Sequence, residues 1–214
     1  MGGSILPVTI KNNTLFFLFG QERNIDENPG WSDFGGGTDK GESFLQTAYR
    51  EGSEELTGFL GDAADIKKLL AKYGTYNVDF KSKGHTTYRC HIFPIHFAEG
   101  AEGAEGAEGM DALTHYYNNN QRFLQKHLDP KIIRDTKIFE KTRIKWFSFA
   151  DMKKQHKQFR SFYQNIISLI LAQQPKIEDF IRKSFTKKRT TTNKCRNTCR
   201  NTCRNKTNKT RKNN

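Results

Sequence analysis

The chain has 214 residues, of which 35% are hydrophobic, and its formal net charge is +13. Eleven of its 36 basic residues and none of its 23 acidic residues lie within 186–214, so the rest of the chain carries a net charge of only +2. No apolar run approaches the roughly 20 residues that a membrane-spanning helix needs. These numbers argue against a membrane-spanning protein and predict one folded domain over 1–185, followed by a disordered basic tail over 186–214.

Strands and helices alternate in the first half of the predicted domain. Four segments are rich in β-branched or aromatic residues and predict strands: Ile5–Ile10, Thr14–Phe19, Tyr76–Phe80 and Thr87–Phe97. The polar turn between the first two strands predicts a β-hairpin. Helices are predicted at Ser43–Leu56, with Gly58 just beyond its end, and at Asp65–Tyr73. Four residues would form the buried face of the first helix: Leu45, Ala48, Gly52 and Leu56.

The second half of the predicted domain begins with an insertion. Four copies of Ala-Glu-Gly at 98–109 contain no core-forming residue, which predicts a solvated insertion in a loop. A weaker helical pattern covers 111–128, and a strand is predicted at Thr142–Phe149. Asp151 is expected to cap the segment after that strand, and a long amphipathic helix is predicted over Phe159–Ile170. Strands that alternate with helices in this way indicate an α/β fold.

Three carboxylates lie on one face of the predicted Ser43–Leu56 helix, because Glu51, Glu54 and Glu55 are three and four residues apart. Like charges at this spacing repel by a few tenths of a kcal/mol per pair. A hard divalent cation removes this repulsion, and such cations commonly bridge carboxylates and substrate phosphates. In isolation the cluster would more often be a solvated helix face. The glycines at 35–37 are not a P-loop, since no Lys followed by Ser or Thr comes after them.

The spacing of six residues resembles the Nudix box of Nudix hydrolases: Gly36, Glu42, Arg50, Glu51, Glu54 and Glu55. The approach from Trp31 to Gly37 is also similar to that of the family. Two features depart from the family pattern. Gly52 stands where the family has an aliphatic residue, and two residues instead of one separate Glu55 from Gly58. We expect the first departure to reflect close packing against a strand and the second to change only the helix exit.

The resemblance implies an α/β/α sandwich with a mixed sheet, and hydrolysis of a pyrophosphate linkage in a nucleoside diphosphate joined to another group. The implied ligands of Mg²⁺ or Mn²⁺ are four: Glu51, Glu54, Glu55 and the carbonyl of Gly35. By the same resemblance, Arg50 would orient the glutamates, and Glu42 and Gly36 would support them. Glu140, before the last predicted strand, is our candidate for an additional acid outside the box. Trp31 is our candidate for stacking on a substrate base.

The basic tail contains a repeat with three cysteines, Cys195, Cys199 and Cys203, which are too few for a zinc site without a nearby His. Its charge favours contact with nucleic acid and therefore an RNA-containing substrate such as capped RNA. The repeat-rich sequence is similar to Nudix proteins of large DNA viruses, some of which remove mRNA caps. The absence of a secretory signal predicts an intracellular, cytoplasmic protein, with nuclear import through 187–189 as an alternative. A non-catalytic RNA-binding protein on a Nudix scaffold is the other function that we consider.

Overall fold

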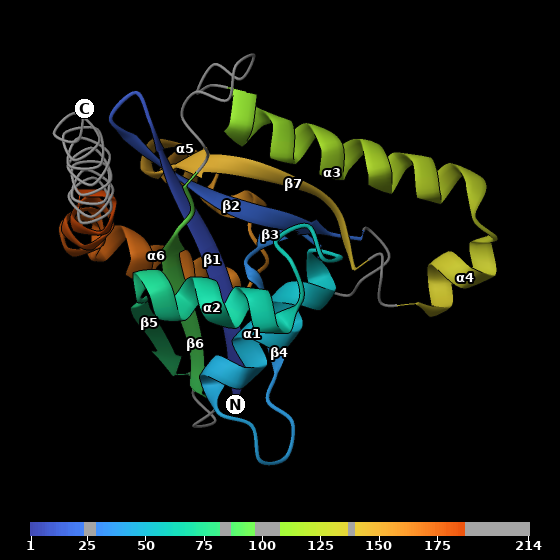
Figure 1. Ribbon diagram of the computed structural model, residues 1–214, viewed down its shortest axis with the longest axis horizontal. Coiled ribbons are helices and arrows are strands. Elements are labelled where there is room, and N and C mark those ends of the chain that lie inside the picture. The colour runs from blue at the N-terminus through green and yellow to red at the C-terminus, as the bar shows by residue number, and fades with distance from the viewer. Residues whose placement is uncertain (24–28, 82–86, 97–107, 137–139, 187–214) are drawn as a thin grey trace, which may run out of the picture.

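The computed structural model describes residues 1–23, 29–81, 87–96, 108–136 and 140–186 (Figure 1). It contains seven strands within these ranges: β1 Gly2–Lys11, β2 Thr14–Glu22, β3 Trp31–Ser32, β4 Phe34–Gly37, β5 Tyr76–Lys81, β6 Thr87–Pro94 and β7 Lys141–Ser148. The helices are α1 Phe44–Glu55, α2 Ala63–Tyr73, α3 Glu108–His127, α4 Pro130–Asp135, α5 Phe149–Lys154, η2 His156–Gln158, α6 Tyr163–Ala172 and a further helix over 174–186. Among the described helices, none has the length and apolar character needed to cross a bilayer.

The strands form one mixed sheet with the order β3-β2-β1-β6-β5. Strand β1 is central: it runs parallel to β6 on one side, while β4 pairs with its beginning and β2 with its end on the other side. Strand β7 pairs antiparallel with β2. The hairpin between β1 and β2 is confirmed. Asn12 and Asn13 have φ angles of 48° and 61°, which is the left-handed conformation that tight two-residue hairpin turns require.

Helices cover both faces of this sheet. Since neighbouring residues of a strand point to opposite faces, consecutive residues of β1 belong to the two different core clusters. On β1, Ile5 belongs to the core cluster beneath α1, which includes Ala48. The next residue, Leu6, belongs to the cluster beneath α6, which includes Ile166. Figure 1 shows α1 and α2 crossing one face of β1 and β6, with α6 behind the sheet. The expected α/β/α sandwich with a mixed sheet is therefore confirmed.

Helix α1 begins at a capping box, in which the side chains and backbone amides of Ser43 and Gln46 bond reciprocally. Its buried residues form a stripe that differs from the predicted one: Thr47, Ala48, Glu51, Gly52 and Glu55. The prediction was wrong for Leu45, whose side chain is 41% exposed. The stripe is rotated because two of the glutamates lie against the sheet, which turns Leu45 outward.

The mid-helix glycine of α1 marks close packing, as expected. A Cβ at Gly52 would lie 2.4 Å from Cδ1 of Ile5 on β1, so a larger residue would force either the Ile5 side chain or the helix to move. Glycine inside a helix costs about 1 kcal/mol relative to alanine. The close approach of α1 to the central strand offsets this cost.

Four other predicted features differ from the structure or lie partly or wholly outside the described residues. Asp151 does not cap α5 alone: Ser148 is the N-cap residue and Asp151 is its partner in a capping box. The predicted helix from Phe159 is shorter, since α6 begins at Tyr163. Of the Ala-Glu-Gly repeat, 98–107 lie outside the described residues, and its last two residues begin α3. The tail from residue 187 onward also lies outside them.

Helix α1 ends in a Schellman motif with an unusual residue at its left-handed position. Gly58 donates its N–H to the carbonyl of Ser53 at 3.0 Å, and Thr57 donates to Glu54 at 2.9 Å. Thr57 has a φ of 49°, a conformation that favours glycine and disfavours β-branched residues. Its hydroxyl oxygen is buried and has no hydrogen-bond partner among the described residues. The additional residue before Gly58 therefore places strain at the end of the acidic helix.

We predict that Thr57→Gly raises the free energy of unfolding by about 1 kcal/mol, because glycine adopts this conformation without a Cβ clash. Urea denaturation followed by circular dichroism measures the change. Thr57→Ala is the matched control, since it removes the branched side chain but keeps the Cβ, and we expect a smaller gain. A loss of stability in Thr57→Gly would show that the threonine side chain stabilises this turn.

Candidate active site

Arg50 is the centre of the acidic cluster. Its Nε and Nη2 donate to the two carboxylate oxygens of Glu42 at 2.8 and 2.9 Å, and its Nη1 donates to Oε1 of Glu51 at 2.7 Å. Nη1 also lies 3.9 Å from Oε2 of Glu54. A bidentate arginine–carboxylate pair is strong, and it also fixes the relative orientation of the two groups. One guanidinium group thus sets the positions of carboxylates on α1 and on the preceding loop.

Glu42 is fully engaged by donors around it. Besides Arg50, the backbone N–H of Asp39 and the hydroxyl of Thr47 donate to its Oε2 at 3.1 and 3.0 Å. The hydrogen bonds from Arg50 lower the pKa of Glu42 from 4.5 to about 2. The same hydrogen bonds raise the pKa of Arg50. Glu42 therefore holds Arg50 in place and has few lone pairs left for another ligand.

Two glycines of β4 bring the strand backbone against the glutamates of α1. A Cβ at Gly36 would lie 2.6 Å from the carboxylate of Glu51, so only glycine lets this side chain lie against the strand. Gly35 donates its backbone N–H to Oε2 of Glu55 at 2.8 Å. The side chains of Glu51 and Glu55 are consequently buried, with residue exposures of 8% and 5%. Glu54, by contrast, has a side chain that is 39% exposed.

Glu55 contacts a lysine that the sequence analysis did not identify. Nζ of Lys141, at the start of β7, lies 3.2 Å from Oε1 of Glu55 and also contacts Glu22 and the hydroxyl of Ser32. Burial raises the pKa of Glu55 to about 8, Lys141 opposes this shift, and the charges of Glu22 and Glu140 add to it. The predicted accessory acid Glu140 thus lies close enough to act on Glu55 through its charge.

Lys141 and Glu22 left no recognisable signal in the sequence. Glu22 ends β2 and Lys141 begins β7, and 119 residues separate them along the chain. The only hint was that Lys141 directly precedes the strand predicted at Thr142–Phe149. Arg160 completes the set, since its Nη1 donates to Oε1 of Glu22 at 2.9 Å.

The carboxylate oxygens of the cluster are of the type that binds a hard divalent cation. Glu51 already faces Arg50, and Glu55 already faces Lys141. Within the described ranges, no three His, Cys, Asp or Glu side chains are grouped so as to hold a metal ion. Glu51, seated in the space that Gly36 leaves, and the more exposed Glu54 offer carboxylate oxygens of the kind that Mg²⁺ and Mn²⁺ bind. These two residues and the adjacent strand carbonyl of Gly35 would hold such an ion.

Trp31 lies in the core. It is 4% exposed, and its ring packs edge-on against Phe147 with ring centroids 5.1 Å apart. The guanidinium carbon of Arg143 lies 5.3 Å from its ring centroid. This burial favours a packing role for Trp31 over stacking on a substrate base.

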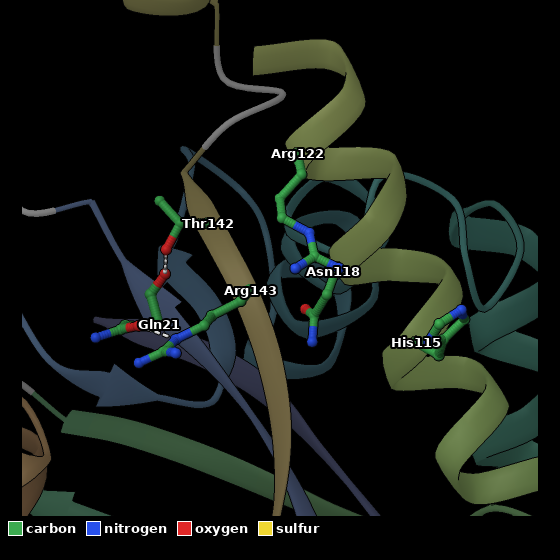
Figure 2. A pocket seen from close by; sticks show the side chains of 6 residues that line it. All are labelled: Gln21, His115, Asn118, Arg122, Thr142 and Arg143. Atoms are coloured by element: carbon green, nitrogen blue, oxygen red, sulfur yellow. Dashed lines mark hydrogen bonds between the residues drawn. The ribbon is translucent and has the colours of Figure 1, made fainter. Parts of the chain in front are cut away.

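A pocket of about 590 Å³ lies beside β7 (Figure 2). Six residues line it: Gln21, His115, Asn118, Arg122, Thr142 and Arg143. Figure 2 shows Arg143 and Gln21 on one side of the strand and the α3 side chains on the other. Arg143 and Arg122 donate to the side-chain oxygens of Gln21 and Asn119, and no carboxylate among the described residues pairs with either arginine. Two arginines whose described hydrogen bonds go to neutral amides favour an anionic ligand.

Helix α3 connects this pocket to the end of the acidic helix. The side chain of Asn118 donates to the carbonyl of Ile144 at 3.1 Å and accepts from its N–H at 2.8 Å. The neighbouring Tyr117 is fully buried, and its hydroxyl donates to the carbonyls of Glu55 and Lys141 at 3.0 and 3.2 Å. The pocket wall and the glutamate cluster are therefore held by consecutive residues of one helix.

Comparisons with known proteins find likeness in structure and none in sequence. No protein-family model matches the chain, and no curated protein matches it. The chain is similar to a C. elegans Ap4A hydrolase in a binary complex, with 14% identity, a TM-score of 0.44, and coverage of 79% of this chain and 92% of that chain. It is also similar to a bifunctional NMN adenylyltransferase/ADP ribose pyrophosphatase of Francisella tularensis complexed with AMP and a manganese ion. That match has 16% identity, a TM-score of 0.47, and coverage of 79% and 40%.

A third similar structure is the Nudix domain of Shewanella oneidensis NrtR complexed with ADP ribose, with 14% identity, a TM-score of 0.39, and coverage of 78% and 83%. Identities of 14–16% and TM-scores of 0.39–0.47 do not assign a family or an activity to this chain. The functional assignment therefore depends on the residues of the site.

We predict that Glu42→Gln lowers stability in a pH-dependent way. Because the pKa of Glu42 is lowered from 4.5 to about 2 in the folded protein, its ionised form stabilises the fold above pH 4.5, and this contribution is lost as the pH falls from 4.5 to 2. Urea denaturation of wild type and Glu42→Gln across this range should show a stability difference that is largest at neutral pH and disappears near pH 2. A difference that stays constant with pH would contradict this assignment.

Proposed function

We propose that the protein is a divalent-cation-dependent Nudix hydrolase that cleaves a pyrophosphate linkage in a nucleoside diphosphate joined to another group. The observation that carries this proposal is the seating of Glu51 against Gly36, with Arg50 bound to both Glu42 and Glu51. A merely solvated acidic helix would expose its carboxylates. Here two of the four box glutamates, Glu51 and Glu55, are at least 92% buried, and Arg50 joins Glu51 to Glu42.

The chain's own residues have distinct tasks in this proposal. Arg50 orients Glu51, and Glu42 orients Arg50 through its bidentate pair. Glu51 and Glu54, with the carbonyl of Gly35, would hold Mg²⁺ or Mn²⁺. When bound there, the cation supplies Lewis-acid activation of a phosphoryl group and of the attacking water. Glu55 is the remaining ligand that the resemblance implies. Its carboxyl oxygens already contact Nζ of Lys141 and the backbone N–H of Gly35.

The substrate is proposed to be an anionic nucleotide whose phosphate-bearing part extends toward the pocket beside β7. Arg122 and Arg143 line this pocket, and carboxylates of the described residues do not neutralise them. Tyr117 connects the pocket wall to Glu55. Capped RNA is the substrate that we favour within this class, because the segment 186–214 adds eleven positive charges that a free nucleotide would not require.

The direct test is hydrolysis of a panel of free nucleotides, dinucleoside polyphosphates, ADP-ribose and capped RNA with Mg²⁺ or Mn²⁺. We predict that Glu54→Gln lowers kcat on the cleaved substrate by about 10²-fold or more, because a metal-holding carboxylate is lost while the fold keeps its shape. Glu178→Gln, a matched change on the helix over 174–186, should leave kcat unchanged. Failure of the wild type to cleave any member of the panel would exclude the proposed activity.

A second candidate function is RNA binding without catalysis on the same scaffold, and the eleven charges of 186–214 favour it. This candidate predicts RNA affinity that does not depend on Glu54. Both candidates predict that deletion of 186–214 weakens RNA binding and reduces its salt dependence. For single strands, each phosphate that a basic side chain neutralises adds about −0.7 to the slope of log K against log salt.

Filter binding of the full chain and the deletion variant at several salt concentrations measures this effect. We expect the deletion to flatten the slope of log K against log salt while cleavage of a short nucleotide substrate stays unchanged. Equal affinities and equal slopes for the two proteins would show that the tail does not contact RNA.

A further inference from the structure

Lys141 is a buried cation within the acidic cluster. The residue is 1% exposed, and its ammonium group contacts the carboxylate of Glu22, the hydroxyl of Ser32 at 2.8 Å and Oε1 of Glu55 at 3.2 Å. An ammonium group is very costly to remove from water unless acceptors surround it. Three acceptors from three different segments meet this requirement, so the position of Lys141 is specified by the fold.

The sheet also has a space for the aliphatic part of this lysine. A Cβ at Gly20 on β2 would lie 2.7 Å from Cδ and 2.8 Å from Cγ of Lys141. The pairing of β2 with β7 shifts register between Gln21 and Glu22, and this irregularity places Lys141 opposite Glu22. Glycine on one strand and a bulge in the ladder thus provide a niche for a single long side chain.

The lysine changes what Glu55 can bind. Oε1 of Glu55 faces Nζ of Lys141, and Oε2 accepts the backbone N–H of Gly35. A divalent cation coordinated by Glu55 would lie within a few ångströms of the ammonium group, where two like charges in a buried site repel strongly. Two cations of the protein, Lys141 and Arg160, already face the carboxyl groups of Glu22 and Glu55. Glu54 lies outside this set and reaches solvent.

We infer that the ammonium group of Lys141 serves as a fixed internal cation at Glu55 and takes the place of one divalent cation there. The divalent cation of the proposed hydrolase is then held by Glu51 and Glu54 with the carbonyl of Gly35. Glu55 is a positioning residue that ties β4 and β7 to the end of α1. This inference rests on the proposed function, because it concerns the cation site of that same cluster.

Binding of Mn²⁺ to the full chain, followed by electron paramagnetic resonance of free Mn²⁺, tests the assignment without measuring activity. We expect Glu54→Gln to raise the Kd of Mn²⁺ by at least about tenfold, whereas Glu55→Gln, which removes no ligand of the ion, raises it by a clearly smaller factor. Equal weakening by the two substitutions would show that Glu55 is a direct ligand and would overturn the inference. A wild type that binds no Mn²⁺ would instead overturn the proposed function and this inference together.

Lys141→Met gives a second measurement, since methionine has a similar length and no charge. With the ammonium group removed, Glu22 and Glu55 are left as buried carboxylates without their common cation, and we expect one additional Mn²⁺ per chain. The additional ion should be lost in Lys141→Met combined with Glu55→Gln. A folded Lys141→Met protein with unchanged Mn²⁺ stoichiometry would contradict the inference. If circular dichroism shows that this variant does not fold, the test of the inference is the Mn²⁺ Kd of Glu54→Gln compared with that of Glu55→Gln.

Discussion

The close approach of α1 to the sheet is the constraint on which the site depends. Three glycines lie where the helix and the strands β1 and β4 meet, and a Cβ at each would come within 2.6 Å of another atom. Gly52 meets Ile5, Gly3 meets the carbonyl of Phe44, and Gly36 meets the carboxylate of Glu51. Interiors this densely packed cannot absorb an additional methyl group without movement. The carboxyl groups of Glu51 and Glu55 therefore lie against the backbone of β4, which fixes their orientation before any ligand arrives.

Burial of charge is the energetic consequence of that approach. Burial of the carboxyl groups of Glu51 and Glu55 beneath a helix is costly unless cations and donors replace the lost water. Arg50 meets this need on one side of α1 and Lys141 on the other. A buried ion pair seldom adds net stability, but removing one partner is strongly destabilising because it leaves the other charge buried without compensation. The network thus makes the geometry of the cluster strongly dependent on each of its members.

The local parts of this arrangement could be predicted from the sequence, whereas its long-range parts could not. The bounds of α1, the hairpin turn and the box spacing depend on residues within a few positions of one another. The niche of Lys141 depends on a glycine and a bulge more than a hundred residues away, which no local pattern encodes. The exposure of Leu45 was mispredicted for a related reason: periodicity gives the apolar stripe of a helix, but the buried glutamates rotated the helix about its axis.

The side chain of Asn118 has a consequence for how this molecule behaves among its own copies. Strand β7 pairs only with β2 in the described sheet, so its other side is an edge with unpaired backbone groups. Asn118 satisfies both the N–H and the carbonyl of Ile144, as a neighbouring strand would. Exposed strand edges recruit other chains and lead to aggregation. By making the hydrogen bonds that one residue of a neighbouring strand would make, the Asn118 amide closes the middle of this edge to another chain.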